Sequence, residues 1–245
     1  MDSPTWTETG TPGTVRLVWQ ETPDVAGVRR AVTAALTGHD RVEAWVLPED
    51  EAAQRAVTWN GMRREGVRRS AAGDHVVYAR LASDTPVTEP DGFRALLNSF
   101  LPRKRAIGQL LVRDTADRVL MCQLTYKEDW DLPGGVVEVG ENPREGVARE
   151  VLEELGLTLP AGNLLLTDWM PPWRGWDDAL CLVFDGGAHA PDVLDAAVLQ
   201  QREIRSVAFL TLDEIAELAA DFTVRRVRSA LDGAGWSESG APLPR

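Results

Sequence analysis

Residues with strong metal and redox chemistry are scarce in this chain. Its 245 residues include only two cysteines, Cys122 and Cys181, and three histidines. Two cysteines inside apolar stretches do not make a disulfide framework, so both are interpreted as buried free thiols. Cysteine and histidine nowhere adopt the spacing of a zinc site. His39, His75 and His189 are therefore interpreted as structural or surface residues.

Long apolar segments are also missing from the sequence. There is no run of 18 or more apolar residues and no apolar N-terminal stretch of signal-peptide length. Internal repeats and heptad runs are absent as well. We therefore expect a cytoplasmic protein without a transmembrane helix.

Acidic residues outnumber basic ones, 38 to 26, which gives a formal net charge of −12. Affinity for a phosphate backbone depends on Lys and Arg, so this balance argues against nucleic-acid and anionic-membrane partners. A small phosphorylated molecule is the expected partner, and it would have to approach such a surface together with a cation. The length suits two modest domains or one large one.

Residues 134–157 organise the chain as a glycine-rich loop that leads into a short helix. Asn142 is a good N-cap, Pro143 suits the first helical position, and Glu145 stands where a capping-box acid reaches back. Gly156 provides the stop. The sequence therefore predicts a helix between Asn142 and Gly156.

Three carboxylates, Glu150, Glu153 and Glu154, share one face of this predicted helix. Like charges at this spacing repel each other, so they favour a bound cation. Hard oxygen ligands suit Mg²⁺ or Mn²⁺. Arg149, one turn before Glu153, can brace a carboxylate. A solvated acidic helix face is the alternative interpretation.

The same stretch resembles the Nudix box, G-x5-E-x7-R-E-U-x-E-E-x-G-U, where U is aliphatic. Every specified position is filled, by Gly135, Glu141, Arg149, Glu150, Val151, Glu153, Glu154, Gly156 and Leu157. The resemblance implies an α+β fold, an α/β/α sandwich around a mixed sheet. It also implies hydrolysis of a nucleoside diphosphate linked to another moiety, with Mg²⁺ or Mn²⁺ as cofactor.

The resemblance also assigns roles to residues of the box. Glu150 and Glu154 would bind the metal, Glu153 would bind metal or act as the base, and a carbonyl from Gly134 would join them. Arg149 would orient a glutamate rather than touch substrate. These assignments make the box the expected catalytic centre.

Residues outside the box are expected to complete the site. Glu203 falls where many family members place an additional acid. The expected substrate-binding residues are Trp130, Asp131, Arg103, Trp173, Arg174 and Asp178. Each of two assignments has an alternative interpretation. The basic cluster around Arg103 would instead be a solvated approach to the first strand of the domain. The tryptophans of loop 170–178 would instead only cover the core.

Residues 14–82 resemble the C-terminal half of a GNAT-type N-acetyltransferase. Residues 46–53 are similar to its P-E-N-x-A strand end, residues 60–67 to its G-F-x-x-E-G turn, and residues 74–78 to its last strand. Residues 24–29 lack the family's glycine-rich pyrophosphate loop, so this unit is interpreted as serving packing, dimerisation or substrate shaping. Active acetyl transfer is the alternative.

The sequence thus predicts five segments. They are a flexible arm (1–13), a partial GNAT-like α/β domain (14–82), a linker with a short helix (83–101), a Nudix domain (102–232) and a tail (233–245). A metal-dependent hydrolase is the first hypothesis. The alternative is a nucleotide-sensing binding module. Its N-terminal unit would then form a homodimer or contact a partner.

Overall fold

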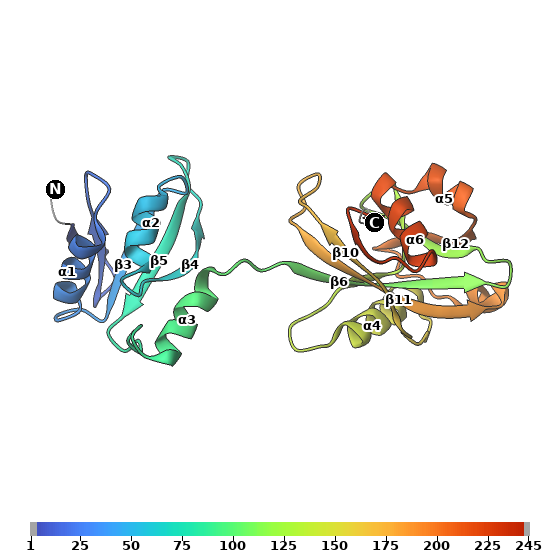
Figure 1. Ribbon diagram of the computed structural model, residues 1–245, viewed down its shortest axis with the longest axis horizontal. Helices are drawn as coiled ribbons and strands as arrows, with labels where there is room; N and C mark the ends of the chain where they lie inside the picture. Colours follow the sequence, from blue (N-terminus) through green and yellow to red (C-terminus); the bar gives the residue numbers. More distant parts are fainter. Residues whose placement is uncertain (1–3, 243–245) are drawn as a thin grey trace. The chain divides into compact units, whose positions relative to one another are not determined.

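The computed structural model describes residues 4–242; residues 1–3 and 243–245 lie outside the described part. The chain forms two compact units, which meet in sequence between Pro102 and Arg103 (Figure 1). We call them unit 1 and unit 2 and describe each by itself.

Unit 1 is built on a five-stranded sheet with the order β1-β2-β3-β5-β4. Its strands are β1 (Thr5–Glu8), β2 (Thr14–Val18), β3 (Arg41–Val46), β4 (Arg63–Arg68) and β5 (His75–Leu81). Its helices are α1 (Val25–Ala35), α2 (Glu51–Thr58) and α3 (Pro90–Phe100). Strands β2 and β3 are parallel, and the other pairings are antiparallel.

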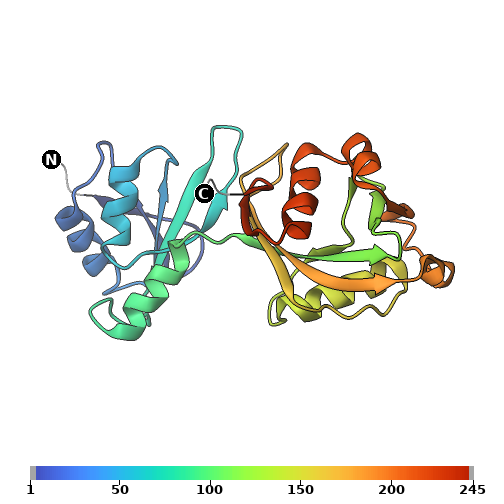
Figure 2. The ribbon, with the colours of Figure 1, turned by 45° about the vertical axis from the view of Figure 1, so that its right-hand side comes forward.

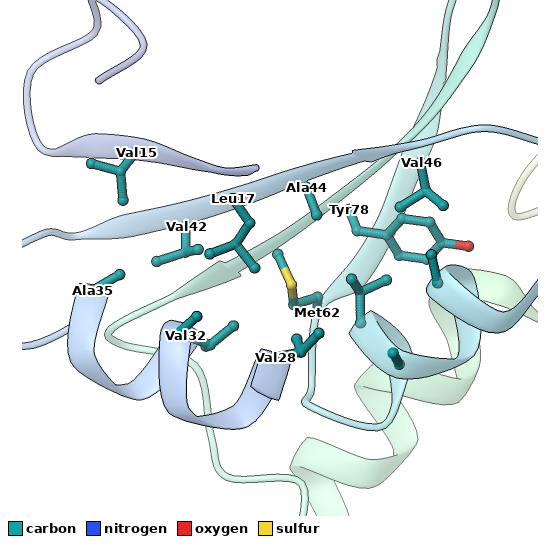
Figure 3. Packing of buried hydrophobic residues seen from close by; sticks show 14 of the residues in the cluster. Val15, Leu17, Val28, Val32, Ala35, Val42, Ala44, Val46, Met62 and Tyr78 are labelled. Carbon is teal, nitrogen blue, oxygen red and sulfur yellow. The ribbon is translucent and has the colours of Figure 1, made fainter. Parts of the chain in front are cut away.

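Alternation along the strands creates the core of unit 1. Val15 and Leu17 of β2, with Val42 and Ala44 of β3, point to one face of the sheet and are buried against α1 and α2 (Figure 3). Successive side chains of a strand point to opposite faces, so this pattern buries one face while the other carries polar residues. Met62 fills the space between the two helices and the sheet.

Two boundaries expected for unit 1 are wrong. The segment 1–13, expected as a flexible arm, contains β1, whose Trp6 lies opposite Leu17 of β2; residues 1–3 of that arm lie outside the described part. The helix expected in the linker 83–101 is α3. It belongs to unit 1, because Ser99 Oγ accepts a hydrogen bond from the Arg64 backbone N–H of β4 at 3.1 Å.

Unit 2 contains a nine-stranded mixed sheet with the order β12-β7-β6-β11-β10-β13-β14, to which β8 and β9 add short pairings. Its strands are β6 (Arg105–Asp114), β7 (Val119–Leu124), β8 (Trp130–Asp131), β9 (Gly134–Val136), β10 (Leu164–Met170), β11 (Ala179–His189), β12 (Ile204–Leu210), β13 (Gly235–Glu238) and β14 (Ala241–Pro242). Its helices are α4 (Pro143–Leu155), the 3₁₀ helix η1 (Pro191–Ala196), α5 (Leu212–Leu218) and α6 (Asp221–Leu231).

The helices of unit 2 cover both faces of this sheet, with α4 on one side and α5 and α6 on the other (Figures 1 and 2). Strand β6 supplies both cores. Leu110 and Val112 pack in the cluster with α4, whereas Leu111 packs in the cluster with α6. The arrangement confirms the α/β/α sandwich with a mixed sheet.

The tail expected at 233–245 is a further correction. Strand β13 pairs in parallel with β10, so that Thr167 lies opposite Trp236, and β14 turns back on β13; residues 243–245 lie outside the described part.

Within residues 4–242, no helix is long and apolar enough to cross a bilayer.

Candidate active site

Helix α4 forms as its sequence predicts. Asn142 Oδ1 accepts a hydrogen bond from the Glu145 backbone N–H at 3.1 Å, and the Glu145 carboxylate reaches back to the Asn142 backbone N–H. Gly156 ends the helix in the left-handed conformation, with φ 67°. The capping box and the glycine fix both ends of the helix, which sets the positions of the acidic residues between them.

Two of those acids lie against the glycine pair of β9. The Gly134 backbone N–H donates a hydrogen bond to Glu154 Oε2 at 3.0 Å. A Cβ atom on Gly135 would lie 2.5 Å from Glu150 Cδ, and one on Gly134 would lie 2.2 Å from the carbonyl oxygen of Gly108. Gly134 therefore requires glycine, since the clash is with backbone and its φ is +131°, whereas at Gly135 the end of the Glu150 side chain would have to move.

Burial makes this carboxylate pair electrostatically unfavourable on its own. The pKa of Glu154 is raised to about 8, chiefly by burial and also by the negative charges of Glu150, Glu203 and Asp131, although the hydrogen bond from the Gly134 N–H lowers it. Burial likewise raises the pKa of Glu150. Anionic oxygens held together out of water fit a divalent cation.

The donor set is smaller than the three glutamates that the sequence suggests. Across residues 4–242, no group of three or more Asp, Glu, His or Cys side chains is arranged to hold an ion. Mg²⁺ is commonly held by one or two carboxylates together with waters and substrate phosphates, and the carboxylates of Glu150 and Glu154 fit a site of this kind. The Glu153 side chain is 58% exposed.

Arg149 connects the acids of the box. Its guanidinium donates to Glu141 Oε1 at 2.8 Å, to Glu150 Oε1 at 3.0 Å and to Glu153 Oε2 at 3.2 Å. It also donates to the carbonyl oxygen of Val136 at 3.2 Å. The guanidinium thus ties α4 to the loop after β9 and holds Glu150 in place.

A pocket with a volume of about 200 Å³ opens beside the glycine pair. Gly134 and Gly135 form part of its wall, so the pocket and the carboxylate pair belong to one site. Its aromatic lining consists of Tyr126, Trp173, Trp176 and Phe222. The Trp173 and Phe222 rings meet edge to face, with 4.9 Å between centroids. Such a lining suits a flat ring.

Polar groups also line this pocket, among them the buried Gln109 and Asp131. Asp131 Oδ1 accepts a hydrogen bond from Gln109 Nε2 at 3.0 Å, and Asp131 Oδ2 pairs with Lys127 Nζ at 2.7 Å. Burial acts to raise the pKa of Asp131, but the positive charges of Lys127 and Arg226 outweigh it and lower the pKa overall. The pocket therefore contains an ionised carboxylate held by a lysine.

The other expected substrate residues are placed differently. Trp130 packs on the core beneath α5 and α6, and Asp178 forms an ion pair with Lys104 at 2.8 Å. Arg174, at a φ of 45°, stacks over Trp173 at 4.7 Å and faces a neighbouring hollow. None of these three, nor Arg103, lines the pocket. Glu203 precedes β12 and is close enough to raise the pKa of Glu154.

Sequence reasoning missed Tyr126, Lys127, Gln109 and Arg226. A signal for Arg226 is present, because it lies on the stripe of α6 that also carries the buried residues Val227 and Ala230. An arginine on an apolar stripe indicates a buried acidic partner. The other three lie on strand or loop positions that carry no spacing signal.

Comparisons with known proteins agree with this geometry. The model of the NUDIX domain family matches residues 102–230. A MutT-like protein from Streptomyces ambofaciens is 34% identical over 134 residues, which cover 53% of this chain and 78% of that protein. An RNA pyrophosphohydrolase from Rhodospirillum rubrum is 30% identical over 77 residues, 31% of this chain; the match spans less than half of that relative, 44%.

Among solved structures, a MutT protein from Methanosarcina mazei is 24% identical, with a TM-score of 0.45, and the match covers 55% of this chain and 96% of that one. The family match and the Streptomyces relative place the chain in the Nudix family. The protein is therefore a hydrolase of the pyrophosphohydrolase class, a class that generally depends on divalent metals. The family match does not extend to residues 1–101.

Proposed function

We propose that this protein hydrolyses a pyrophosphate linkage in a nucleoside diphosphate joined to another moiety, with Mg²⁺ or Mn²⁺ as cofactor. The observation that carries the proposal is the pair Glu150 and Glu154, held against Gly134 and Gly135 at the wall of an aromatic pocket. Such a pair has the charge and the ligand type for a hard cation that arrives with phosphate.

Glu150 and Glu154 would hold the ion. When bound, a divalent ion neutralises phosphate oxygens and lowers the pKa of a nearby water. Arg149 keeps Glu150 oriented through its bond to Oε1. The exposed carboxylate of Glu153 is our candidate for the group that accepts the proton of the attacking water, with Glu203 as the second choice. A carbonyl ligand from Gly134 is part of the same proposal.

The pocket supplies the binding of the organic part of the substrate. Trp173 and Tyr126 offer ring faces, and the Lys127 ammonium beside Asp131 offers hydrogen bonds. A pocket of this kind combines stacking with a few fixed polar groups, which is how small-molecule sites gain orientation. We therefore propose Asp131 and Trp173, which both line the pocket, as substrate-binding residues.

A substrate panel tests the proposal. The purified protein is incubated with Mg²⁺ or Mn²⁺ and nucleoside triphosphates, nucleotide sugars, dinucleoside polyphosphates or ADP-ribose, and phosphate, pyrophosphate and nucleoside monophosphate are measured separately. We expect turnover of one class and its loss in Glu154→Gln. Glu145→Gln, on the same helix, preserves the capping box and should retain the wild-type rate.

The same panel decides the alternative of a nucleotide-sensing module. Stabilisation by a nucleotide and metal without any product would favour sensing over hydrolysis. The GNAT-like character of unit 1 has no support from the comparisons and stays a prediction. A dimer, residence in the cytoplasm and the absence of nucleic-acid partners also stay predictions.

A further inference from the structure

Unit 1 carries a surface groove that the Nudix site does not use. Its volume is about 620 Å³, and it lies between α2, the β4–β5 hairpin and the end of α3. Tyr78 is part of its lining, and Figure 3 shows the Tyr78 hydroxyl pointing away from the core cluster. A groove of this size falls within the range of small-molecule sites, roughly 300–1,000 Å³.

Large apolar side chains around this groove are left in water. Trp59 is 65% exposed, Val67 is 50% exposed and Phe100 is 37% exposed. Each lines the groove together with the buried Tyr78. Neighbouring exposed aromatic and aliphatic groups on a soluble protein indicate a binding surface, and here they can hold a flat ring.

Two arginines, Arg55 and Arg64, give the groove its charge. No acidic side chain lines the groove, and neither arginine has an ion-pair partner within residues 4–242. Arg63 of the same strand, by contrast, pairs with Asp84 at 3.0 Å. Arg55 lies one helical turn before Trp59, the C-cap of α2, so the two residues are neighbours on one face of the helix and both line the groove.

We propose that this groove binds a nucleoside phosphate, with the base against Trp59 and the phosphate against Arg55 and Arg64. Aromatic stacking accepts any base, and the planar guanidinium matches phosphate oxygens. The inference does not depend on the proposed function, because the groove and the Nudix site share no residue.

Equilibrium dialysis of the full chain with labelled AMP and ATP tests this site. EDTA and the Glu154→Gln background prevent turnover. Trp59→Ala and the double variant Arg55→Ala/Arg64→Ala should each weaken binding about tenfold or more. Arg69→Ala/Arg94→Ala removes the same charge from unit 1 outside the groove and should bind as the parent does.

A second variant separates the groove from the Nudix pocket. Trp173→Ala alters the Nudix pocket alone, and binding at the groove should persist in it. Unchanged affinity in both groove variants, or loss of all binding in Trp173→Ala, would overturn the proposal. The proposal would also be overturned if the groove bound an acidic peptide but bound neither AMP nor ATP at millimolar concentration. Circular dichroism melts confirm that every variant is folded.

Discussion

Arg226 and Asp168 form an ion pair in the interior of unit 2, with 2.8 Å between Nε and Oδ2 and with both side chains buried. The other nitrogens of Arg226 reach Gln109 Oε1 at 3.0 Å and Met170 Sδ at 2.9 Å. Asp168 Oδ1 accepts from Ser237 Oγ and from the Gly240 N–H, each at 2.8 Å. One charge pair therefore connects α6, the sheet and the C-terminal hairpin.

Replacement of Arg226 by Met should strongly destabilise the protein. It would leave the Asp168 carboxylate buried without a cation, and breaking such a pair lowers the free energy of unfolding by about 3–5 kcal/mol. Urea unfolding followed by circular dichroism measures the change. The exposed Arg228 on the same helix is the control, and Arg228→Met should change stability by less than about 0.5 kcal/mol. Equal effects of the two variants would contradict this account.

The stability of the metal-free protein should fall as pH rises from about 5 to 8. The pKa of Glu154 is about 8 in the folded state and near 4.5 in the unfolded state, so the folded state holds this proton more tightly. Stability from this group is complete below the lower pKa and is lost by up to ~1.4 kcal/mol per pH unit between the two. In EDTA, Glu154→Gln should be less pH-dependent and more stable than the wild type at pH 8. Urea midpoints across this pH range measure it, and parallel curves for the two proteins would refute the assignment.

Gly135→Ala should impair catalysis more than folding. The new Cβ would meet the Glu150 carboxylate, which is flexible and can move away. We expect the metal-binding geometry to suffer while the melting temperature changes little. Gly38→Ala, where a Cβ meets nothing within 4 Å, is the control and should keep the wild-type activity and melting temperature. An active Gly135→Ala enzyme would show that Glu150 does not need its present position.

Arg149→Lys should weaken metal binding about 10–100-fold, because Arg149 holds the proposed metal ligand Glu150 in place and loss of such a hydrogen-bonding partner lowers metal affinity by this amount. A single ammonium cannot hold Glu141, Glu150 and the Val136 carbonyl together as the guanidinium does. Calorimetric titration with Mn²⁺ gives the affinity without reliance on turnover. Arg144→Lys, exposed on the same helix, should bind Mn²⁺ as the wild type does.

The sequence was most informative where a residue has local consequences. Asn142, Glu145 and Gly156 determine the ends of α4 through contacts within a few residues, so the helix was predictable. Helical spacing put Glu150, Glu153 and Glu154 on one face, and the resemblance to the Nudix box selected Glu150 and Glu154 among them.

Long-range contacts were beyond the reach of these signals. Arg226 meets Asp168, 58 residues away, only after the sheet has formed. The apolar stripe of α6 indicates that Arg226 has a buried acidic partner, but not which acid it is. The segment 233–245 reads as a tail because its glycines and serine suggest a loop. Its pairing with β10 depends on a strand that is distant in the sequence, since Asp168 and Ser237 are 69 residues apart.

The C-terminal hairpin sets a practical limit on how unit 2 can be isolated. A fragment cut at residue 230, where the family match ends, would lose β13 and uncover the edge of β10. It would also remove Ser237 and Gly240, and Asp168 Oδ1 would lose both of its donors. Bare strand edges and unsatisfied buried carboxylates promote aggregation and unfolding. A catalytic unit expressed on its own should therefore extend through residue 242.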